Sequence, residues 1–293
     1  MKNYWLFLLL AGCITGLVVT IPEETGSIEA FFCDKVDCSE VFLNKTSNAS
    51  SVSCAMYHAN SRFFEIFDNA KFVVDEEYPL PGAVTEFGTG LMHNKFCIID
   101  NKFVWTGSWN PNQEMTIANN VVFIESPTIA KAYQAEFDEL SGGIFHKGDS
   151  MPGLVKFNGQ LVEAYFCPED DCQKNVIDVL DSAEWSIHFM TYAFTDNEIG
   201  DLLLHKLENG IEVRGLFDPR KNKYSEYEKL KDVSKVQKIH HKVFIIDGNT
   251  VITGSYNPSR NADKQNDENV IIIRDKNVAQ QFENEFEKLY LLN

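Results

Sequence analysis

The sequence predicts an α/β protein built from two tandem repeats. Residues 28–140 and 161–293 can be aligned with each other, and both run through a strand, a helical stretch, further strands and a closing amphipathic helix. Four short apolar runs are typical of strands covered on both faces: 96–99, 121–124, 243–246 and 270–273. Strands of this kind with helices between them indicate an α/β architecture.

The N-terminal segment, residues 1–27, precedes the first repeat and is mostly apolar. No charged residue occurs from Trp5 to Ile21, and Lys2 precedes that run. This pattern is typical of an export signal or a membrane anchor with the rest of the chain outside. We expect an uncleaved anchor first, a lipoprotein with its lipid on Cys13 second and a cleaved signal third. A buried helix of the folded domain is the remaining alternative.

The closing helix of each repeat has three apolar side chains at spacings of four and three, which places them on one helix face. They are Tyr133, Phe137 and Leu140 in the first repeat and Phe282, Phe286 and Leu289 in the second. A helix is also expected over 198–207, and its counterpart in the first repeat, 62–69, looks shorter. The alignment then pairs Asp75 with Asp218. Residues 141–160 are rich in turn formers and are expected to be a linker.

The cysteines of the repeats fall into two groups. Two pairs share one spacing and one sequence context, Cys33 with Cys38 and Cys167 with Cys172. An exported protein can keep such pairs as local disulfides, and a zinc site is the alternative, although the usual Cys-x2-Cys spacing is absent. Cys54 and Cys97 align with Phe189 and Phe244, so we expect them to be small buried apolar residues.

The charge of the chain is strongly acidic, with a formal net charge of −17 from 26 basic and 43 acidic side chains. This excess disfavours non-specific adhesion to nucleic acid or anionic lipid. A basic mouth on the acidic body is still conceivable from five residues: Lys95, Lys242, Arg220, Lys221 and Lys223. The alternative is that the acidic excess only keeps the protein soluble.

One motif occurs in both repeats without a gap: His-x-Lys, four residues, Asp, six residues, Gly-Ser-x-Asn. The first copy is His93, Lys95, Asp100, Gly107, Ser108 and Asn110, and the second is His240, Lys242, Asp247, Gly254, Ser255 and Asn257. Chance does not explain the whole pattern at matching positions of two repeats. The duplication indicates one active site built from two halves.

These residue types suit phosphodiester chemistry without a metal or cofactor. The lysines and Asn amides can neutralise phosphate oxygens, and the hydroxyls of Ser108 and Ser255 can add donors. One neutral imidazole can attack phosphorus while the other, protonated, gives its proton to the leaving alcohol. Asp100 and Asp247 are catalytic candidates, with turn formation as an alternative of at least equal weight.

The doubled motif resembles that of the phospholipase D superfamily, the HKD phosphodiesterases, and is most similar to its short prokaryotic branch. The resemblance implies that each repeat is a sheet flanked by helices. It also implies that the fused repeats pack as a pseudo-twofold dimer within a monomer, with the site at the seam. Reaction would pass through a phosphohistidine on His93, with His240 as the general acid and base.

The first repeat departs from the family pattern at one position. The family often has Asn-Glu-Asn after the Gly-Ser turn, and its Glu orients a catalytic His. The second repeat has Asp267-Glu268-Asn269, but the first has Asn119 at the Glu position, and Glu114 is poorly placed to replace it. Glu268 is therefore a catalytic candidate that supports one His more strongly, and the sequence leaves open which one.

Four functions remain in order of preference. The first is an exported, membrane-tethered phosphodiesterase that cleaves a phospholipid. The second is a metal-independent endonuclease acting on DNA or RNA, and the others are a phosphatidyl transferase and an inactive binding protein.

Overall fold

The computed structural model describes residues 21–59, 70–111 and 117–292. The apolar run up to residue 20, the expected short helix over 62–69 and Glu114 lie outside the described residues. Within the described part of the chain, no helix is both long and apolar enough to cross a membrane.

The first half contains a seven-stranded mixed sheet in the order β2-β8-β7-β6-β3-β4-β5. Its elements are β2 (Ile28–Phe32), α1 (Cys38–Thr46), β3 (Val52–Met56), β4 (Ala70–Val74), β5 (Val84–Thr85), β6 (Lys95–Ile99), β7 (Phe103–Gly107), β8 (Asn120–Glu125) and α3 (Pro127–Ser141). Strands β3, β4 and β5 are parallel, and the other pairs are antiparallel.

The second half contains a nine-stranded mixed sheet in the order β1-β9-β10-β16-β15-β14-β11-β12-β13. Its strands are β1 (Glu23–Glu24), β9 (Gly153–Phe157), β10 (Gln160–Cys167), β11 (Ser186–Thr191), β12 (Glu212–Phe217), β13 (Ser234–Val236), β14 (Lys242–Ile246), β15 (Thr250–Gly254) and β16 (Glu268–Arg274). Its helices are α4 (Cys172–Asp181), α5 (Asn197–Glu208), η1 (Pro219–Tyr224), α6 (Tyr227–Leu230), η2 (Lys231–Val233), α7 (Arg260–Lys264) and α8 (Lys276–Leu291).

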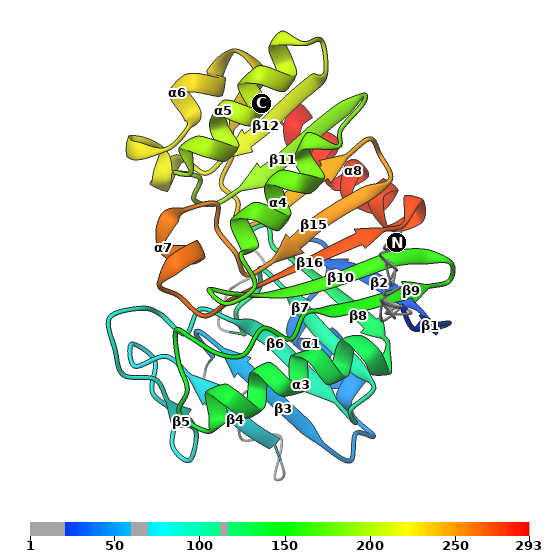
Figure 1. The fold of residues 1–293 in the computed structure, drawn as a ribbon, viewed down its shortest axis with the longest axis vertical. Helices are drawn as coiled ribbons and strands as arrows, with labels where there is room; N and C mark the ends of the chain where they lie inside the picture. Colours follow the sequence, from blue (N-terminus) through cyan, green and yellow to red (C-terminus); the bar gives the residue numbers. More distant parts are fainter. Residues whose placement is uncertain (1–20, 60–69, 112–116, 293) are drawn as a thin grey trace, which may run out of the picture.

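The predicted α/β fold of two repeats is confirmed (Figure 1). One hydrophobic core cluster contains side chains from both halves, and each half has a further cluster of its own. Helix α3 packs against β3, β6 and β7 of its own half and against β9 and β10 of the other. Helix α8 packs against β11, β14 and β15 and also reaches β2 of the first half. The six apolar side chains predicted to face inward from these two helices are all buried. Because both helices contribute to a core between the sheets, the halves form one body with a seam.

The predicted boundaries of the repeats differ from the structure at two places. Strand β9 lies inside the expected linker, where it pairs with β10, and β1 lies inside the expected N-terminal segment, where it pairs with β9. Glu24 of β1 also accepts hydrogen bonds from Ser126 and Thr128 at the start of α3. The turn formers of 141–160 mark the bends at each end of β9. Buried and more exposed side chains alternate over only the five residues of β9, which is too short a pattern to predict the strand.

The disulfides confirm one expectation and correct another. Cys33–Cys38 and Cys167–Cys172 are bonded as predicted. Cys54 and Cys97, expected to be buried thiols, form a third disulfide. The reason is their register: they are directly opposite each other on β3 and β6, with Cα atoms 4.1 Å apart. Phe189 and Phe244 occupy the same opposed positions on β11 and β14, so the two repeats correspond at these residues.

Candidate active site

His93 and His240 lie at the seam, each just before the strand that carries its Lys. The backbone N–H of His93 donates to Asp267 O of the second half at 2.9 Å, and that of His240 donates to Ala118 O of the first half at 2.8 Å. Each histidine is therefore fixed in part by the backbone of the opposite repeat. The two copies of the motif meet at one place, as the duplication predicted.

The side chains that orient the two imidazoles also come from the opposite repeats. His93 Nδ1 lies 2.8 Å from Glu268 Oε2, and His240 Nδ1 lies 2.8 Å from Asn119 Oδ1 and 3.0 Å from Ser108 O. Glu268 and Asn119 are both fully buried. The question left open by the sequence is thus answered: Glu268 contacts His93, and the two half-sites differ by one buried carboxyl group.

Ser108 and Ser255 hold these orienting side chains. Ser108 Oγ lies 3.3 Å from Asn119 Oδ1 and accepts the Asn120 N–H at 3.0 Å. Ser255 Oγ accepts the Asn269 N–H at 2.9 Å, and its hydroxyl also hydrogen-bonds the Glu268 carboxyl group. These contacts engage both hydroxyls within the protein, so they position the histidine partners, which differs from the phosphate donors expected above.

Lys95 and Lys242 are buried beside the histidines. Lys95 Nζ donates to His93 O at 2.7 Å, and Lys242 Nζ donates to His240 O at 3.0 Å and lies 3.4 Å from His240 Nε2. Burial lowers the pKa of Lys95 to about 7, and burial together with the charge of Lys95 lowers the pKa of Lys242 well below its usual range. A phosphate anion between the two amines would reverse both effects, because it supplies the missing counter-charge.

Burial also sets the protonation of the histidines and of Glu268. Burial and the two lysines lower the pKa of His93 and of His240 well below the usual value, while burial raises the pKa of Glu268 to about 7. When Glu268 is ionised it can only accept, so the His93 proton is on Nδ1 and Nε2 has a free lone pair. That is the tautomer a nucleophilic histidine requires.

The structure does not bring Asp100 and Asp247 to the site. Asp100 lies beyond the far end of β6 and accepts the N–H groups of Ser50 and Ser51 at 2.8 and 2.9 Å. Asp247 lies at the matching end of β14 and accepts N–H groups from Glu184, Trp185 and Ser186. Both residues have a positive φ, near 50°. These contacts support the turn-forming alternative over a catalytic role.

The remaining motif residues, Asn110 and Asn257, follow β7 and β15 immediately after the Gly-Ser turns. Asn110 is buried and Asn257 is partly exposed. The turns need glycine, because Gly107 and Gly254 have φ values of 155° and 133°. A Cβ on Gly107 would come within 2.2 Å of Asn120 O, and one on Gly254 within 2.3 Å of Asn269 O.

Several functional residues were not predicted from the sequence. Tyr57 and Tyr192 place their rings 4.8 and 4.6 Å from the rings of His93 and His240. Their signal was present, since each ends an equivalent strand of the aligned repeats. Thr106 donates to Asn269 Oδ1 and the Asn120 amide donates to Thr253, each at 2.7 Å and each across the seam.

The aspartates paired by the alignment have matching roles behind the histidines. Asp75 Oδ2 accepts the Met92 N–H and Asp218 Oδ2 accepts the Ile239 N–H, both at 2.9 Å. Each therefore fixes the residue directly before a motif histidine. His241 turns its Nδ1 to Asn120 Oδ1 at 2.9 Å, away from the partner of His240.

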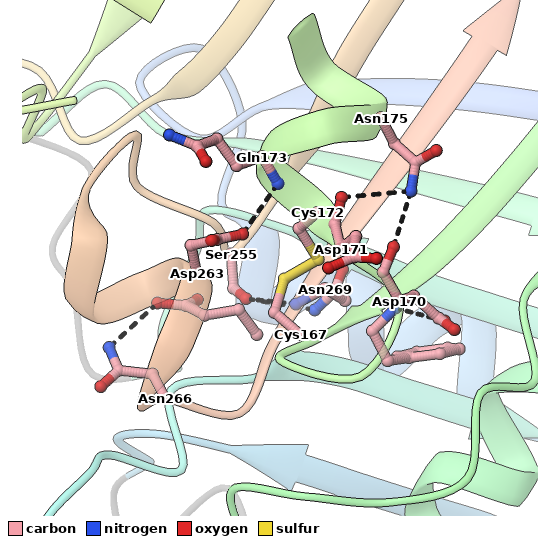
Figure 2. The surroundings of a disulfide bond; sticks show 12 residues. Cys167, Asp170, Asp171, Cys172, Gln173, Asn175, Ser255, Asp263, Asn266 and Asn269 are labelled. Atoms are coloured by element: carbon pink, nitrogen blue, oxygen red, sulfur yellow. Dashed lines mark hydrogen bonds between the residues drawn. A yellow bond between two sulfur atoms is a disulfide. The ribbon is translucent and has the colours of Figure 1, made fainter. Parts of the chain in front are cut away.

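Each local disulfide lies beside the side chain that orients a histidine. Cys167 is paired with Glu268 across β10 and β16, and the Cys33 N–H donates to Asn119 O at 2.9 Å. Figure 2 shows the Cys167–Cys172 bond next to Ser255 and Asn269, with α4 tied to α7 through Gln173 and Asp263. The disulfides therefore brace the walls that carry Glu268 and Asn119.

Among the described residues, one cluster of carboxylate side chains has the geometry to surround a cation: Glu136, Glu139 and Glu169. It includes none of the motif residues.

Comparisons with known proteins show a family and a fold that this chain shares. Residues 41–141 and 176–290 match the family model described as "Cardiolipin synthase, PLD-like domain". A phospholipase D of Rickettsia conorii is 39% identical over 138 residues, which cover 44% of this chain and 69% of that protein. A mitochondrial cardiolipin hydrolase of Chlamydomonas reinhardtii is 26% identical over 194 residues, covering 54% and 86%. Phosphatidylserine synthase of Haemophilus influenzae shares the fold, with a TM-score of 0.68 at 13% identity over 92% of this chain and 88% of that structure.

Proposed function

We propose that this chain acts in two steps through a covalent phosphohistidine. The chain belongs to the phospholipase D superfamily and is a phosphodiesterase of that class. The observation that supports the two-step reaction is the crossed pairing of His93 with Glu268 and of His240 with Asn119. One imidazole has an anionic partner and the other a neutral one. The two histidines are therefore suited to different roles.

In the first step, His93 Nε2 forms a bond to phosphorus while the bond from phosphorus to the leaving oxygen breaks. Glu268 stabilises the positive charge that develops on the imidazole, because its carboxylate accepts the Nδ1 proton at 2.8 Å. His240, charged once the phosphate anion is bound, gives its Nε2 proton to the leaving alcohol. Its Nδ1 proton stays in place, since Asn119 Oδ1 and Ser108 O both accept it.

In the second step, His240 takes a proton from water, the resulting hydroxide attacks phosphorus, and the bond to His93 breaks. Another alcohol in place of water would make the same reaction a transfer. Lys95 and Lys242 neutralise the non-bridging oxygens in both steps. These residues supply nucleophile, acid, base and charge neutralisation, so we propose that the reaction needs no metal.

We propose a phospholipid as substrate, at the outer face of a membrane to which the apolar run before β1 tethers the chain. The three disulfides of the described residues support an oxidising, extracytoplasmic compartment. The shared core supports a monomer that contains both half-sites. A nuclease with the same residues is the alternative, because the motif residues suit a phosphate diester, which lipids and nucleic acids share.

The test compares fluorescent phosphatidylcholine, cardiolipin, single-stranded DNA and RNA with the purified chain, before and after thorough chelation. Turnover of lipid that survives chelation is expected. Cleavage of nucleic acid alone would replace the lipid proposal with the nuclease, and loss of all turnover on chelation would refute the metal-free mechanism. A His93→Asn variant that still becomes covalently phosphorylated would refute His93 as the nucleophile.

A further inference from the structure

Among the described residues, the loops beside His93 and His240 carry side chains of opposite charge at equivalent positions. We call these two groups of side chains the mouths of the two halves: Tyr57, Glu77 and Tyr78 in the first, and Tyr192, Arg220 and Lys221 in the second. Asp75 Oδ1 accepts the Glu77 N–H at 2.9 Å, and Asp218 Oδ1 accepts the Arg220 N–H at 2.8 Å. Because the two aspartates also hold the residues before His93 and His240, this contact fixes the register of both loops. Glu77 is therefore the counterpart of Arg220. By the same register, Tyr78 and Lys221, the next residues in the two loops, occupy equivalent positions.

The mouth of the first half is acidic and aromatic. Tyr57, whose ring lies 4.8 Å from that of His93, donates a hydrogen bond from its hydroxyl to Glu77 Oε2 at 2.5 Å. The Tyr78 ring stands 5.3 Å from that of Tyr57, edge to face. A second anionic group would meet the Glu77 carboxylate on this side and be repelled.

The mouth of the second half has the same frame with basic side chains. The Tyr192 ring lies 4.6 Å from that of His240, and over it stand Arg220 Cζ at 4.9 Å and Lys221 Nζ at 5.5 Å. Asp218 offsets part of the Arg220 charge through an ion pair at 2.7 Å, which makes the exposed Lys221 the stronger attractant for an anion. The chain as a whole carries a charge of −17, so this basic mouth contrasts with its surroundings.

We propose that Tyr192, Arg220 and Lys221 form a subsite for a second anionic group on the leaving alcohol. This rests on the proposed function, in which His240 protonates the leaving oxygen and the leaving alcohol therefore lies on the side of Tyr192. Glu77 excludes the same group from the first half, so the substrate enters in one direction. The class of substrate is a phosphodiester whose leaving alcohol bears a further phosphate, which describes both a diphosphatidyl lipid and a polynucleotide.

The test exchanges equivalent residues between the halves. Lys221→Tyr gives the second mouth the residue of the first. We expect kcat/KM on cardiolipin, or on a short oligodeoxynucleotide if that is the better substrate, to fall about twofold to fivefold more than on bis(4-nitrophenyl) phosphate, which has no second anion. High salt should abolish this difference, because the interaction is exposed and screened. Lys174→Tyr, the same charge change on α4, is the matched control and should show no such difference.

A second variant tests the direction of binding. Tyr78→Lys gives both mouths a lysine, so the doubly anionic substrate should bind in both directions, one of them unproductive. We expect kcat and KM on that substrate to fall together by about twofold or more, with kcat/KM little changed. Equal losses on singly and doubly anionic substrates with Lys221→Tyr would overturn the subsite. A wild-type chain inactive on all three substrates would overturn the proposed function itself, and the subsite with it.

Discussion

Replacing Glu268 by Gln removes the charge that distinguishes the partners of the two histidines and keeps the shape of the side chain. Glu268 is fully buried and its Oε2 lies 2.8 Å from His93 Nδ1. A hydrogen bond to a charged group contributes about 1.5–3 kcal/mol, and every 1.4 kcal/mol is about tenfold in rate. We therefore predict that Glu268→Gln lowers kcat/KM by about ten- to a hundredfold, and more if the Gln amide donates to Nδ1 and reverses the tautomer.

The same substitution should change the dependence of the rate on pH. Burial raises the pKa of Glu268 to about 7, and only the ionised carboxyl group selects the nucleophilic tautomer of His93. The wild-type kcat/KM should therefore rise toward pH 7 as Glu268 loses its proton and fall above pH 7 as Lys95 loses its own, and only the rise should be absent in Glu268→Gln. The assay is initial rate on bis(4-nitrophenyl) phosphate between pH 5 and 9.

Asn119→Gln is the matched control, because it alters the partner of His240 without changing charge. It should leave the rise near pH 7 in place, whatever its effect on kcat. If Glu268→Gln keeps both the wild-type rate and the wild-type pH profile, the carboxylate does not orient the nucleophile and the assignment of roles is wrong.

Three other predictions follow from separate contacts. His240→Asn should still release one equivalent of 4-nitrophenolate per chain from bis(4-nitrophenyl) phosphate and then stall, because that leaving group needs no acid but hydrolysis of the intermediate needs the base; steady turnover without a burst would contradict this. Asp247→Asn should lower the free energy of unfolding by about 1–3 kcal/mol, measured by urea titration, because the Asp247 carboxylate accepts three backbone N–H groups. The kcat of the folded variant should stay within about twofold of the wild type. A large loss of kcat at unchanged stability would restore the catalytic role of Asp247. The Cys167→Ser/Cys172→Ser pair should lower kcat/KM about tenfold, because Cys167 is paired with Glu268. Cys54→Ser/Cys97→Ser should lower the Tm with little change in kcat, and equal kinetic losses from both pairs would show that the brace is not specific.

The sequence predicted the parts of this protein that the repeat made visible. The doubled motif located His93, Lys95, His240 and Lys242, and the apolar runs located the central strands. The sequence could not show that Glu268 pairs with His93, because contacts across the seam depend on how the halves pack. That packing involves α3 and α8, which contact strands of both halves.

The errors came from the same limit. The Cys54–Cys97 bond depends on cross-strand register, which the spacing of the cysteines does not reveal, although the aligned phenylalanines pair in the same way. Asp100 and Asp247 recur with the motif histidines and lysines because the turn after each motif strand recurs. A repeated pattern shows that a residue is needed at a position, and only the contacts show whether structure or chemistry needs it.

The most direct test of the central claim is to identify the residue that becomes phosphorylated. The chain is mixed with substrate, quenched in alkali after a single turnover, digested and analysed by mass spectrometry of the phosphopeptides. The mechanism predicts a phosphoryl group on His93 that is still esterified to the alcohol that does not leave, in a peptide distinct from that containing His240. Phosphate on His240, or release of product with no phosphohistidine at any quench time, would contradict it.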